Sequence, residues 1–150
     1  MAQQLPVILF PGSFDPFTIG HKSLVDRALP LCGRLIIAIG HNASKPGAES
    51  VEDRIEAIRR IYRHEPRVEV TAYTGLTVDA CRELGATWML RGVRTVADFE
   101  YERNLADINR DLSGIDTLIL FTLPGMASVS SSMVRELASH GHDVSRFIPS

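Results

Sequence analysis

The sequence has 150 residues, of which 45% are apolar and 23% are charged. A chain of this length usually forms one domain and buries roughly two-thirds of its unfolded surface, and the composition excludes a disordered or collagen-like protein. Sixteen basic residues against 18 acidic ones give a formal net charge of −2, which attracts neither nucleic acid nor an anionic membrane to the molecule as a whole. We therefore expect a single domain over residues 1–150, no nucleic-acid partner, and a local site for any anion.

The apolar runs and the cysteines bear on the compartment. The longest apolar runs, Leu5–Phe10 and Leu118–Leu123, are far shorter than the ~20 residues that cross a bilayer. Cys32 and Cys81 fall in predicted helices and lack the C-x-x-C spacing of a redox pair. We expect no membrane partner, two buried free thiols and a cytoplasmic location.

Short apolar runs alternate with segments of helical periodicity from the start of the chain. A strand is predicted over Leu5–Phe10, and the apolar spacing of Leu24–Leu29 predicts a helix that Pro30 and Gly33 end. A second apolar run, Leu35–Ile39, predicts the next strand.

The same alternation continues to the end of the chain. The second helix is predicted over Val51–Tyr62 with Ser50 as its N-cap, and the third strand over Val68–Ala72. The remaining predicted elements are a helix over Val78–Leu84 capped by Gly85, a strand over Thr87–Leu90, a helix over Val96–Leu112 ending near Gly114, a strand over Thr117–Thr122, and a helix opened by Ser130–Ser132.

Five predicted strands thus alternate with helices. Strands that are apolar throughout are buried on both faces, and helical crossovers between them require parallel pairing with right-handed connections. The sequence therefore predicts an α/β fold, a Rossmann-like three-layer sandwich around a five-stranded parallel sheet. Trp88 is expected in its core.

The carboxyl ends of the strands are where such a sheet binds ligands, because free N–H groups at the helix starts point outward there. Four predicted loops at this edge carry groups that can bind phosphate: Pro11–His21, His41–Lys45, Arg91–Arg94 and Ser128–Ser132. The patterns G-x-x-x-x-G-K-[ST] and G-x-G-x-x-G do not occur in the sequence. A nucleotide cradle other than a P-loop or a dinucleotide fingerprint is therefore required.

Several of these segments resemble known motifs. Thr18-x-Gly20-His21 resembles the (H/T)-x-G-H motif, and Ser130-Ser131-Ser132 the I-S-S-type motif, of the cytidylyltransferase-like nucleotidyltransferase superfamily. Together with Pro11–Pro16, Arg91-Gly92-x-Arg94 and Asp98–Glu102, they form a pattern similar to that of bacterial phosphopantetheine adenylyltransferases. The match keeps the expected order and spans nearly the whole chain.

This resemblance implies an activity. It implies transfer of the adenylyl group of ATP to 4′-phosphopantetheine, giving dephospho-coenzyme A and pyrophosphate, the penultimate step of coenzyme A synthesis. It also implies Mg²⁺ with ATP, a homohexamer, and inhibition by coenzyme A in the same cleft. The attacking group would be a phosphate that is already ionised, so the protein needs to align two anions and neutralise charge rather than supply a nucleophile.

Catalytic roles follow from the same resemblance. His21 is expected to contact the ATP phosphates and stabilise the transition state. Ser13, where the family commonly has Thr, is expected to donate its hydroxyl to the pantetheine phosphate or the α-phosphate. Lys45 and Arg91 are expected to hold the pantetheine phosphate, and Thr77 to lie along the pantetheine arm.

The expected ATP-binding residues come from three parts of the chain. They are Ser13, Phe14 and His21; Gly92, Val93, Arg94 and Glu102; and Met126, Ala127, Ser128, Val129, Ser130, Ser131 and Ser132. No metal-binding residue is expected, because His140 and His142 have no third ligand placed nearby by spacing.

Two other interpretations of the cradle stay open at this point. A nicotinate-mononucleotide adenylyltransferase or a glycerol-phosphate cytidylyltransferase belongs to the same superfamily, but it should fit the segments Arg91–Arg94 and Asp98–Glu102 poorly. A catalytically silent nucleotide or coenzyme A sensor would keep the cradle and lose the transition-state groups, whereas His21, Lys45 and Arg91 are all present.

Overall fold

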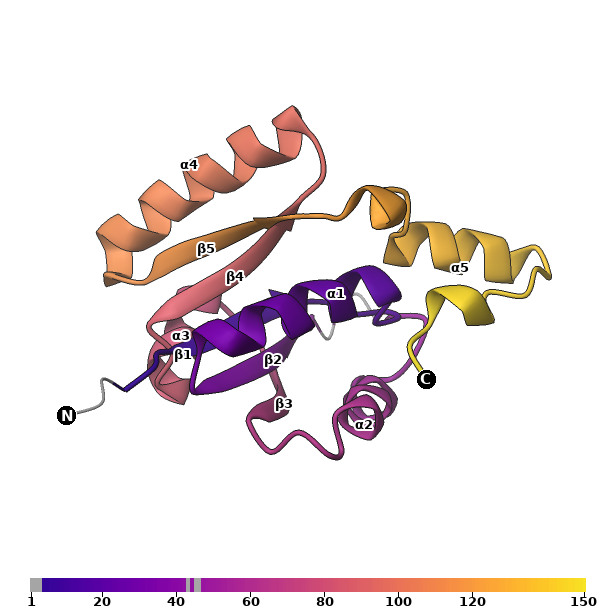
Figure 1. The fold of residues 1–150 in the computed structure, drawn as a ribbon, viewed down its shortest axis with the longest axis horizontal. Coiled ribbons are helices and arrows are strands. Elements are labelled where there is room, and N and C mark those ends of the chain that lie inside the picture. The colour runs from indigo at the N-terminus through magenta and orange to yellow at the C-terminus, as the bar shows by residue number, and fades with distance from the viewer. Residues whose placement is uncertain (1–3, 43, 45–46) are drawn as a thin grey trace.

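A five-stranded parallel sheet forms the centre of the computed structural model, which describes residues 4–42, 44 and 47–150. The strands lie in the order β3-β2-β1-β4-β5, and each neighbouring pair is parallel (Figure 1). They are β1 (Val7–Gly12), β2 (Arg34–Gly40), β3 (Val68–Tyr73), β4 (Trp88–Val93) and β5 (Asp116–Phe121).

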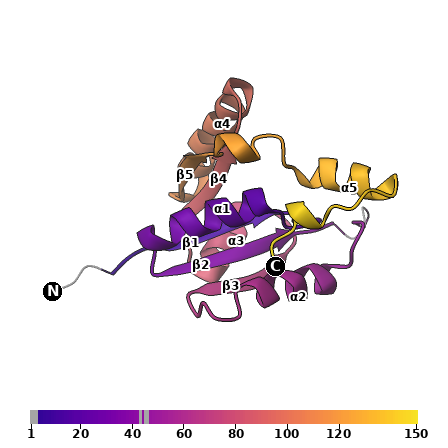
Figure 2. The same ribbon diagram turned by 45° about the vertical axis from the view of Figure 1, so that its right-hand side comes forward.

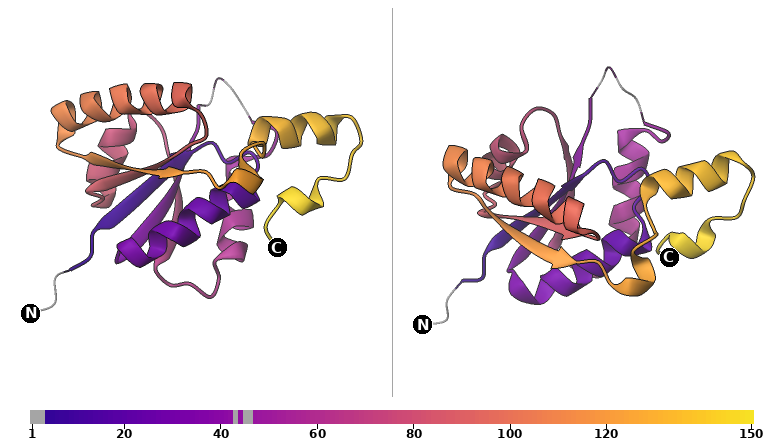
Figure 3. Two further views of the ribbon diagram at one scale, coloured as in Figure 1. Left: turned by 45° about the horizontal axis from the view of Figure 1, so that its top comes forward. Right: turned by 90° about the horizontal axis from the view of Figure 1, so that it is seen from above.

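Helices cover both faces of this sheet. Helices α1 (Ile19–Ala28) and α2 (Val51–Ile61) lie on one face, and α3 (Thr77–Leu84) and α4 (Val96–Ser113) on the other (Figure 3). Helix α5 (Ser131–Ser139) lies beyond the sheet, near the start of α1 (Figure 1). Short 3₁₀ helices span Leu29–Leu31, Pro124–Met126 and Ser145–Phe147. The predicted Rossmann-like three-layer α/β fold is confirmed.

The side chains of β1 divide the core between the two faces. Ile8 and Phe10 belong to the larger apolar cluster, to which α1 and α2 contribute. Leu9 belongs to the smaller cluster, with Val78 and Cys81 of α3. Because successive side chains of a strand point to opposite faces, a strand covered on both sides must be apolar throughout.

Strands β1 and β4 extend further toward the ligand edge than the sequence predicts. β1 ends at Gly12 instead of Phe10, and β4 includes the segment Arg91–Val93 that the sequence places in a loop. Pro11 has no N–H to donate to a neighbouring strand. It can still belong to β1, because β1 pairs with β4 only through Ile8 and Leu9 and Pro11 therefore pairs with β2 alone. Arg91 is therefore held by a strand.

The helix ends agree with the capping signals of the sequence. The hydroxyl of Ser50 accepts the N–H of Asp53 at 3.1 Å and caps α2. Gly85 and Gly114 follow α3 and α4 in the left-handed conformation, with φ of 77° and 75°. These predicted caps are confirmed.

Two core predictions have opposite outcomes. Cys32 and Cys81 are buried free thiols, as predicted. Trp88 is 37% exposed, so its prediction as a core residue is wrong. It is the first residue of β4 and lies at the rim of the sheet. Within the described ranges, no helix is both long and apolar enough to span a bilayer.

Candidate active site

The start of α1 orients the imidazole of His21. The hydroxyl of Thr18 caps the helix by accepting the N–H of His21 at 3.4 Å, and the N–H of Thr18 donates to Nδ1 of His21 at 2.9 Å. Because a backbone N–H can only donate, Nδ1 carries no proton. The proton of the neutral ring is therefore on Nε2.

Aromatic rings keep His21 in its neutral form. The ring of Phe17 stacks on the imidazole at a centroid distance of 5.4 Å, and Phe14 meets it edge-on at 5.0 Å. Burial among these rings lowers the pKa of His21 from 6.5 to about 4. Near pH 7 the side chain is thus a neutral hydrogen-bond donor.

A cavity of about 330 Å³ lies at the carboxyl ends of β1 and β4. Ser13, His21, Arg91 and Ser131, which come from three distant segments of the chain, all line it. The remaining lining residues are Phe10, Pro11, Gly12, Phe14, Thr18, Gly20, Leu24, Gly92, Arg94, Thr122, Val129, Ser130, Ser132 and Arg135. The fourth predicted segment contains Lys45, which lies outside the residues that the structure describes.

Helix α5 is tied to the loop between β1 and α1. The hydroxyl of Ser131 donates to the carbonyl of Pro16 at 2.6 Å, and Nη1 of Arg135 donates to the carbonyl of Asp15 at 2.6 Å. Figure 2 shows α5 projecting beyond the sheet, with the C-terminal segment folded back beneath it. These two contacts place the first turn of α5 against the cavity, where its N–H groups can face an anion.

Arg91 and Glu102 form a two-point ion pair. Nη2 and Nε of Arg91 donate to the two carboxylate oxygens of Glu102 at 2.6 and 2.9 Å. The side chain of Glu102 is 8% exposed. Burial alone would lower the pKa of Arg91, but the hydrogen bonds and charge of Glu102 outweigh it and raise the pKa. Arg91 therefore stays charged, and Glu102 offsets much of that charge.

A second cavity of about 430 Å³ adjoins the first. Pro11, Gly12, Ser13 and Arg91 line both cavities. The second cavity is more apolar and includes Tyr73, Leu76, Thr77, Val78, Met89, Glu102, Leu105 and Leu112 among its lining residues. The hydroxyls of Tyr73 and Thr77 are 2.7 Å apart. Two ligands in these cavities would meet at Ser13 and Arg91.

The structure brings together most, but not all, of the predicted ATP-binding residues. Ser13, Phe14, His21, Gly92, Arg94, Val129, Ser130, Ser131 and Ser132 line the first cavity. Val93, Met126, Ala127 and Ser128 are not among its lining residues, and Glu102 lines the second cavity instead. Arg94 extends toward the Pro124–Met126 turn, where its Nη1 donates to the carbonyl of Ala127 at 3.4 Å.

Three lining residues with polar side chains were not among the predicted site residues. Thr18 caps α1, Arg135 fixes α5, and Thr122 follows β5 at the rim. The sequence held a signal for two of them. Thr18 and His21 have the spacing of a capping box, and Arg135 lies one turn after the serines. Thr122 had none.

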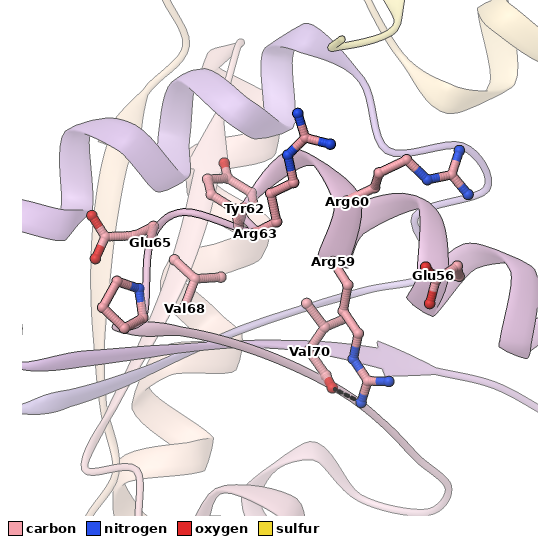
Figure 4. A pocket seen from close by; sticks show the side chains of 9 residues that line it. Glu56, Arg59, Arg60, Tyr62, Arg63, Glu65, Val68 and Val70 are labelled. Carbon is pink, nitrogen blue, oxygen red and sulfur yellow. Dashed lines mark hydrogen bonds between the residues drawn. The ribbon is translucent and has the colours of Figure 1, made fainter.

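Two other hollows adjoin α2, and the larger of them shares Phe14 and Arg135 with the first cavity. One of about 480 Å³ lies between α2 and β3 and is lined by Arg59, Arg60, Arg63 and neighbours, with Arg59 turned back to the carbonyl of Val70 (Figure 4). A larger one of about 930 Å³ lies between α2 and α5. Among the described residues, no group of three or more His, Cys, Asp or Glu side chains could hold a metal ion.

Comparison with known proteins identifies the family. The profile of the family described as Cytidylyltransferase-like matches residues 9–137. A phosphopantetheine adenylyltransferase of Porphyromonas gingivalis is 52% identical over 143 residues, which are 95% of this chain and 94% of that protein. One from Bacteroides fragilis is 50% identical over 141 residues, which are 94% of each chain. The chain belongs to the phosphopantetheine adenylyltransferase family. This confirms the resemblance seen in the motifs.

Solved structures agree on the fold. A bifunctional NMN adenylyltransferase/ADP ribose pyrophosphatase from Francisella tularensis, complexed with AMP and a manganese ion, has a TM-score of 0.72 at 17% identity. The match covers 98% of this chain and 45% of that chain. A lipopolysaccharide core biosynthesis protein from Thermoplasma volcanium has a TM-score of 0.57 at 16% identity, over 79% of this chain and 97% of that one. At these identities the likeness concerns the fold alone.

Proposed function

We propose that the chain transfers the adenylyl group of ATP to 4′-phosphopantetheine and releases dephospho-coenzyme A and pyrophosphate. The observation that carries this proposal is the pair of adjoining cavities. One is polar and lined by a helix start and His21, the other is more apolar, and both are lined by Ser13 and Arg91. Membership of the adenylyltransferase family supports the choice of substrates.

The reaction needs alignment more than acid–base chemistry. An ionised phosphate oxygen of 4′-phosphopantetheine attacks the α-phosphorus of ATP, and the bond from that phosphorus to the leaving pyrophosphate breaks. The attacking oxygen carries no proton that must be removed. The protein therefore lowers the barrier by holding two anions in line and by stabilising the charge that moves onto pyrophosphate.

His21 supplies a fixed donor to this transition state. Its Nδ1 is occupied by the N–H of Thr18, so Nε2–H is left to donate to a phosphate oxygen. A neutral imidazole attracts the ground-state phosphates less than an imidazolium would, and its hydrogen bond strengthens as charge develops on the oxygen.

The remaining groups divide between the two substrates. Arg94 and the start of α5 at Ser130–Ser132 would hold the ATP phosphates in the first cavity. Ser13, Lys45 and Arg91 would hold the acceptor phosphate, with Thr77 further along the pantetheine arm in the second cavity. Because Glu102 offsets the charge of Arg91, the guanidinium would act by its directed N–H groups, and Lys45 would add a second positive group.

Mg²⁺ would accompany ATP as its phosphate complex. The residues that line the first cavity offer hydroxyl, amide, imidazole and guanidinium groups and no carboxylate. They therefore do not form a protein site for the ion. Magnesium keeps several waters and binds readily to substrate phosphates, so its ligands would come from ATP and solvent.

Three further properties belong to the proposal. Coenzyme A would inhibit by occupying the same two cavities as dephospho-coenzyme A. The free thiols Cys32 and Cys81 suit the cytoplasm.

A homohexamer is supported by exposed apolar side chains on α4 and at the end of β5, such as Tyr101, Leu112 and Phe121, which are 63%, 63% and 69% exposed. Light scattering of the purified chain would measure the assembly.

The activity is tested by incubating the chain with ATP, Mg²⁺ and 4′-phosphopantetheine. We expect equal amounts of pyrophosphate and dephospho-coenzyme A, by coupled assay and mass spectrometry. ATP with nicotinate mononucleotide and CTP with glycerol 3-phosphate serve as alternative pairs. Turnover of either pair in place of the first would reassign the substrate, and ATP binding without any turnover would favour the silent sensor.

A further inference from the structure

Two charged residues are buried beside the site without lining the cavity for ATP. Asp15 and Arg54 are 6% and 5% exposed. Asp15 lies in the loop between β1 and α1, and Arg54 lies in α2. Burying a charge is costly unless hydrogen bonds compensate it. The partners of these two side chains therefore show what they hold in place.

Arg54 joins α2 to the backbone of Ser13. Its Nη1 donates to the carbonyl oxygen of Ser13 at 2.7 Å, and its Nε donates to the carbonyl oxygen of Ser50 at 3.4 Å. The guanidinium thus connects the amino end of α2 to the residue that lines both cavities. The hydroxyl of Ser13 has no hydrogen-bond partner among the described residues, and the residue is exposed, so a ligand can reach it.

Asp15 holds the turn that precedes α2 against the same loop. Its Oδ2 accepts the N–H of Ala48 at 2.7 Å, and its Oδ1 accepts the N–H of Glu49 at 3.2 Å. A Cβ atom added at Gly47 would come within 2.5 Å of Oδ2 of Asp15 and 3.2 Å of Nη2 of Arg54. The approach is so close that only glycine fits there without a shift.

The opposite side of the loop is held by α5. Ser131 and Arg135 donate to the carbonyls of Pro16 and Asp15, as described above. The segment from Ser13 to Pro16 is thus clamped between α5, which faces the ATP cavity, and the start of α2. Loss of the α2 contacts would free Ser13 while leaving the α5 contacts, and with them the ATP phosphate site, in place.

From these contacts we infer that Arg54, assisted by Asp15, is a positioning residue that sets the backbone of Ser13 for attack by the acceptor phosphate. The inference rests on the proposed function. Arg54 lines neither of the two substrate cavities and so does not touch the reacting atoms. It acts through its hydrogen bond to the backbone of Ser13. Since misplacement by about 1 Å can cost roughly 100-fold in rate, a loosened Ser13 should impair acceptor use more than ATP binding.

The decisive variant is Arg54→Met, which keeps an unbranched side chain and removes the donors. A matched control is Arg67→Met, because Nη1 of Arg67 also donates to backbone carbonyls, those of Leu29 and Cys32 at 3.0 and 3.4 Å, away from both cavities. We expect both variants to lower the melting temperature. Only Arg54→Met should lower kcat/KM for 4′-phosphopantetheine, by roughly 10- to 100-fold, with less than about threefold change in KM for ATP. Arg54→Lys should recover part of the loss.

A second variant and a second readout cover the case of an unfolded Arg54→Met. Gly47→Ala keeps every charge but forces the turn away from Asp15, and it should show the same preferential loss of acceptor use. Hydrogen exchange of the amides of residues 12–17 should be faster in either variant than in Arg67→Met. Equal effects on both substrates, or kinetics like those of Arg67→Met, would overturn the inference. If the unsubstituted chain has no turnover, the proposed function fails. The exchange rates then test by themselves whether Arg54 and Asp15 hold the loop that contains Ser13.

Discussion

The N–H of Thr18 donates to Nδ1 of His21 at 2.9 Å, so the cap of α1 and the proposed catalytic imidazole form one hydrogen-bonded unit. The cap orients the ring and fixes its tautomer, while Phe14 and Phe17 keep it neutral. A side chain held in this way does not need to move as the reaction proceeds. Preorganised donors of this kind stabilise a transition state more than a ground state.

His21→Ala should therefore reduce turnover far more than ATP binding. Removing one preorganised donor costs roughly 100- to 1,000-fold in kcat, and we expect KM for ATP to change little. Lys22→Ala, in the next position and with an exposed partner in Asp26, is the control and should keep its turnover. Steady-state kinetics with saturating acceptor measure both. A His21→Ala variant with unchanged kcat would remove His21 from the mechanism.

The low pKa of His21 also predicts how stability depends on pH. The ring titrates near 6.5 when unfolded and at about 4 when folded, so between these values the unfolded chain binds a proton that the folded chain does not. The free energy of unfolding should fall as pH decreases from 6.5 toward 4, by on the order of 2 kcal/mol from this group. The slope from this group should fade above pH 6.5, as the imidazole of the unfolded chain also loses its proton.

Urea unfolding of the unsubstituted chain and of His21→Asn at several pH values isolates the effect. Hydrogen bonds lower the pKa of carboxylates such as Glu65 and Asp143, so their protonation at low pH also destabilises the fold. This effect is the same in both proteins and cancels when their free energies of unfolding are subtracted. The difference between the two proteins should shrink toward pH 4. A difference that is the same at pH 4.5 and pH 7.5 would contradict the neutral, buried imidazole.

Arg91→Ala should weaken acceptor use and also destabilise the fold. It leaves the carboxylate of Glu102, whose side chain is 8% exposed, without its partner. Breaking a buried ion pair in this way costs about 3 kcal/mol. Adding Glu102→Gln to Arg91→Ala should restore part of the stability but not the use of 4′-phosphopantetheine. Thermal unfolding and kinetics of the two variants separate the roles, and restored acceptor kinetics in the double variant would refute the role of Arg91.

Arg94→Ala should mainly affect ATP. Arg94 lines the first cavity only, and its contact with Asp98 is an exposed pair at 3.7 Å, so its loss should cost less than about 1 kcal/mol of stability. We expect KM for ATP to rise about tenfold, the effect of losing one charge-assisted hydrogen bond, with KM for the acceptor nearly unchanged. The reverse pattern would mean that the two cavities have been assigned to the wrong substrates.

Local signals predicted the order and type of the elements because each was strong by itself. Gly85 and Gly114 end helices by a property of the single residue, and Ser50 caps α2 across one turn. The ends of β1 and β4 were harder to predict from the sequence, because they depend on which strand each residue pairs with. Pro11 remains in β1 only because its β4 neighbour has already diverged, and no local pattern states this.

The site was predictable where residues of the motifs themselves line the cavity, and less predictable where tertiary contacts decide which residues meet. Ser13, His21 and Ser130–Ser132 meet at one cavity because their loops share one edge of the sheet, which the fold alone dictates. The pairing of Glu102 with Arg91 depends on how α4 lies on β4, so the sequence could not place that carboxylate. The roles of Asp15 and Arg54 depend on contacts across more than 30 residues of chain, as the 41-residue separation of Ser13 and Arg54 illustrates.

A crystal structure of the chain with dephospho-coenzyme A would locate both substrate positions at once, because this product spans the two cavities. We expect its AMP portion beside His21, Arg94 and the start of α5, its pantetheine arm beside Thr77 and Leu76, and the bridging phosphates between Ser13 and Arg91. Density for the product in the hollow between α2 and α5, or with its two halves exchanged, would contradict the assignment of ATP and 4′-phosphopantetheine to the two cavities.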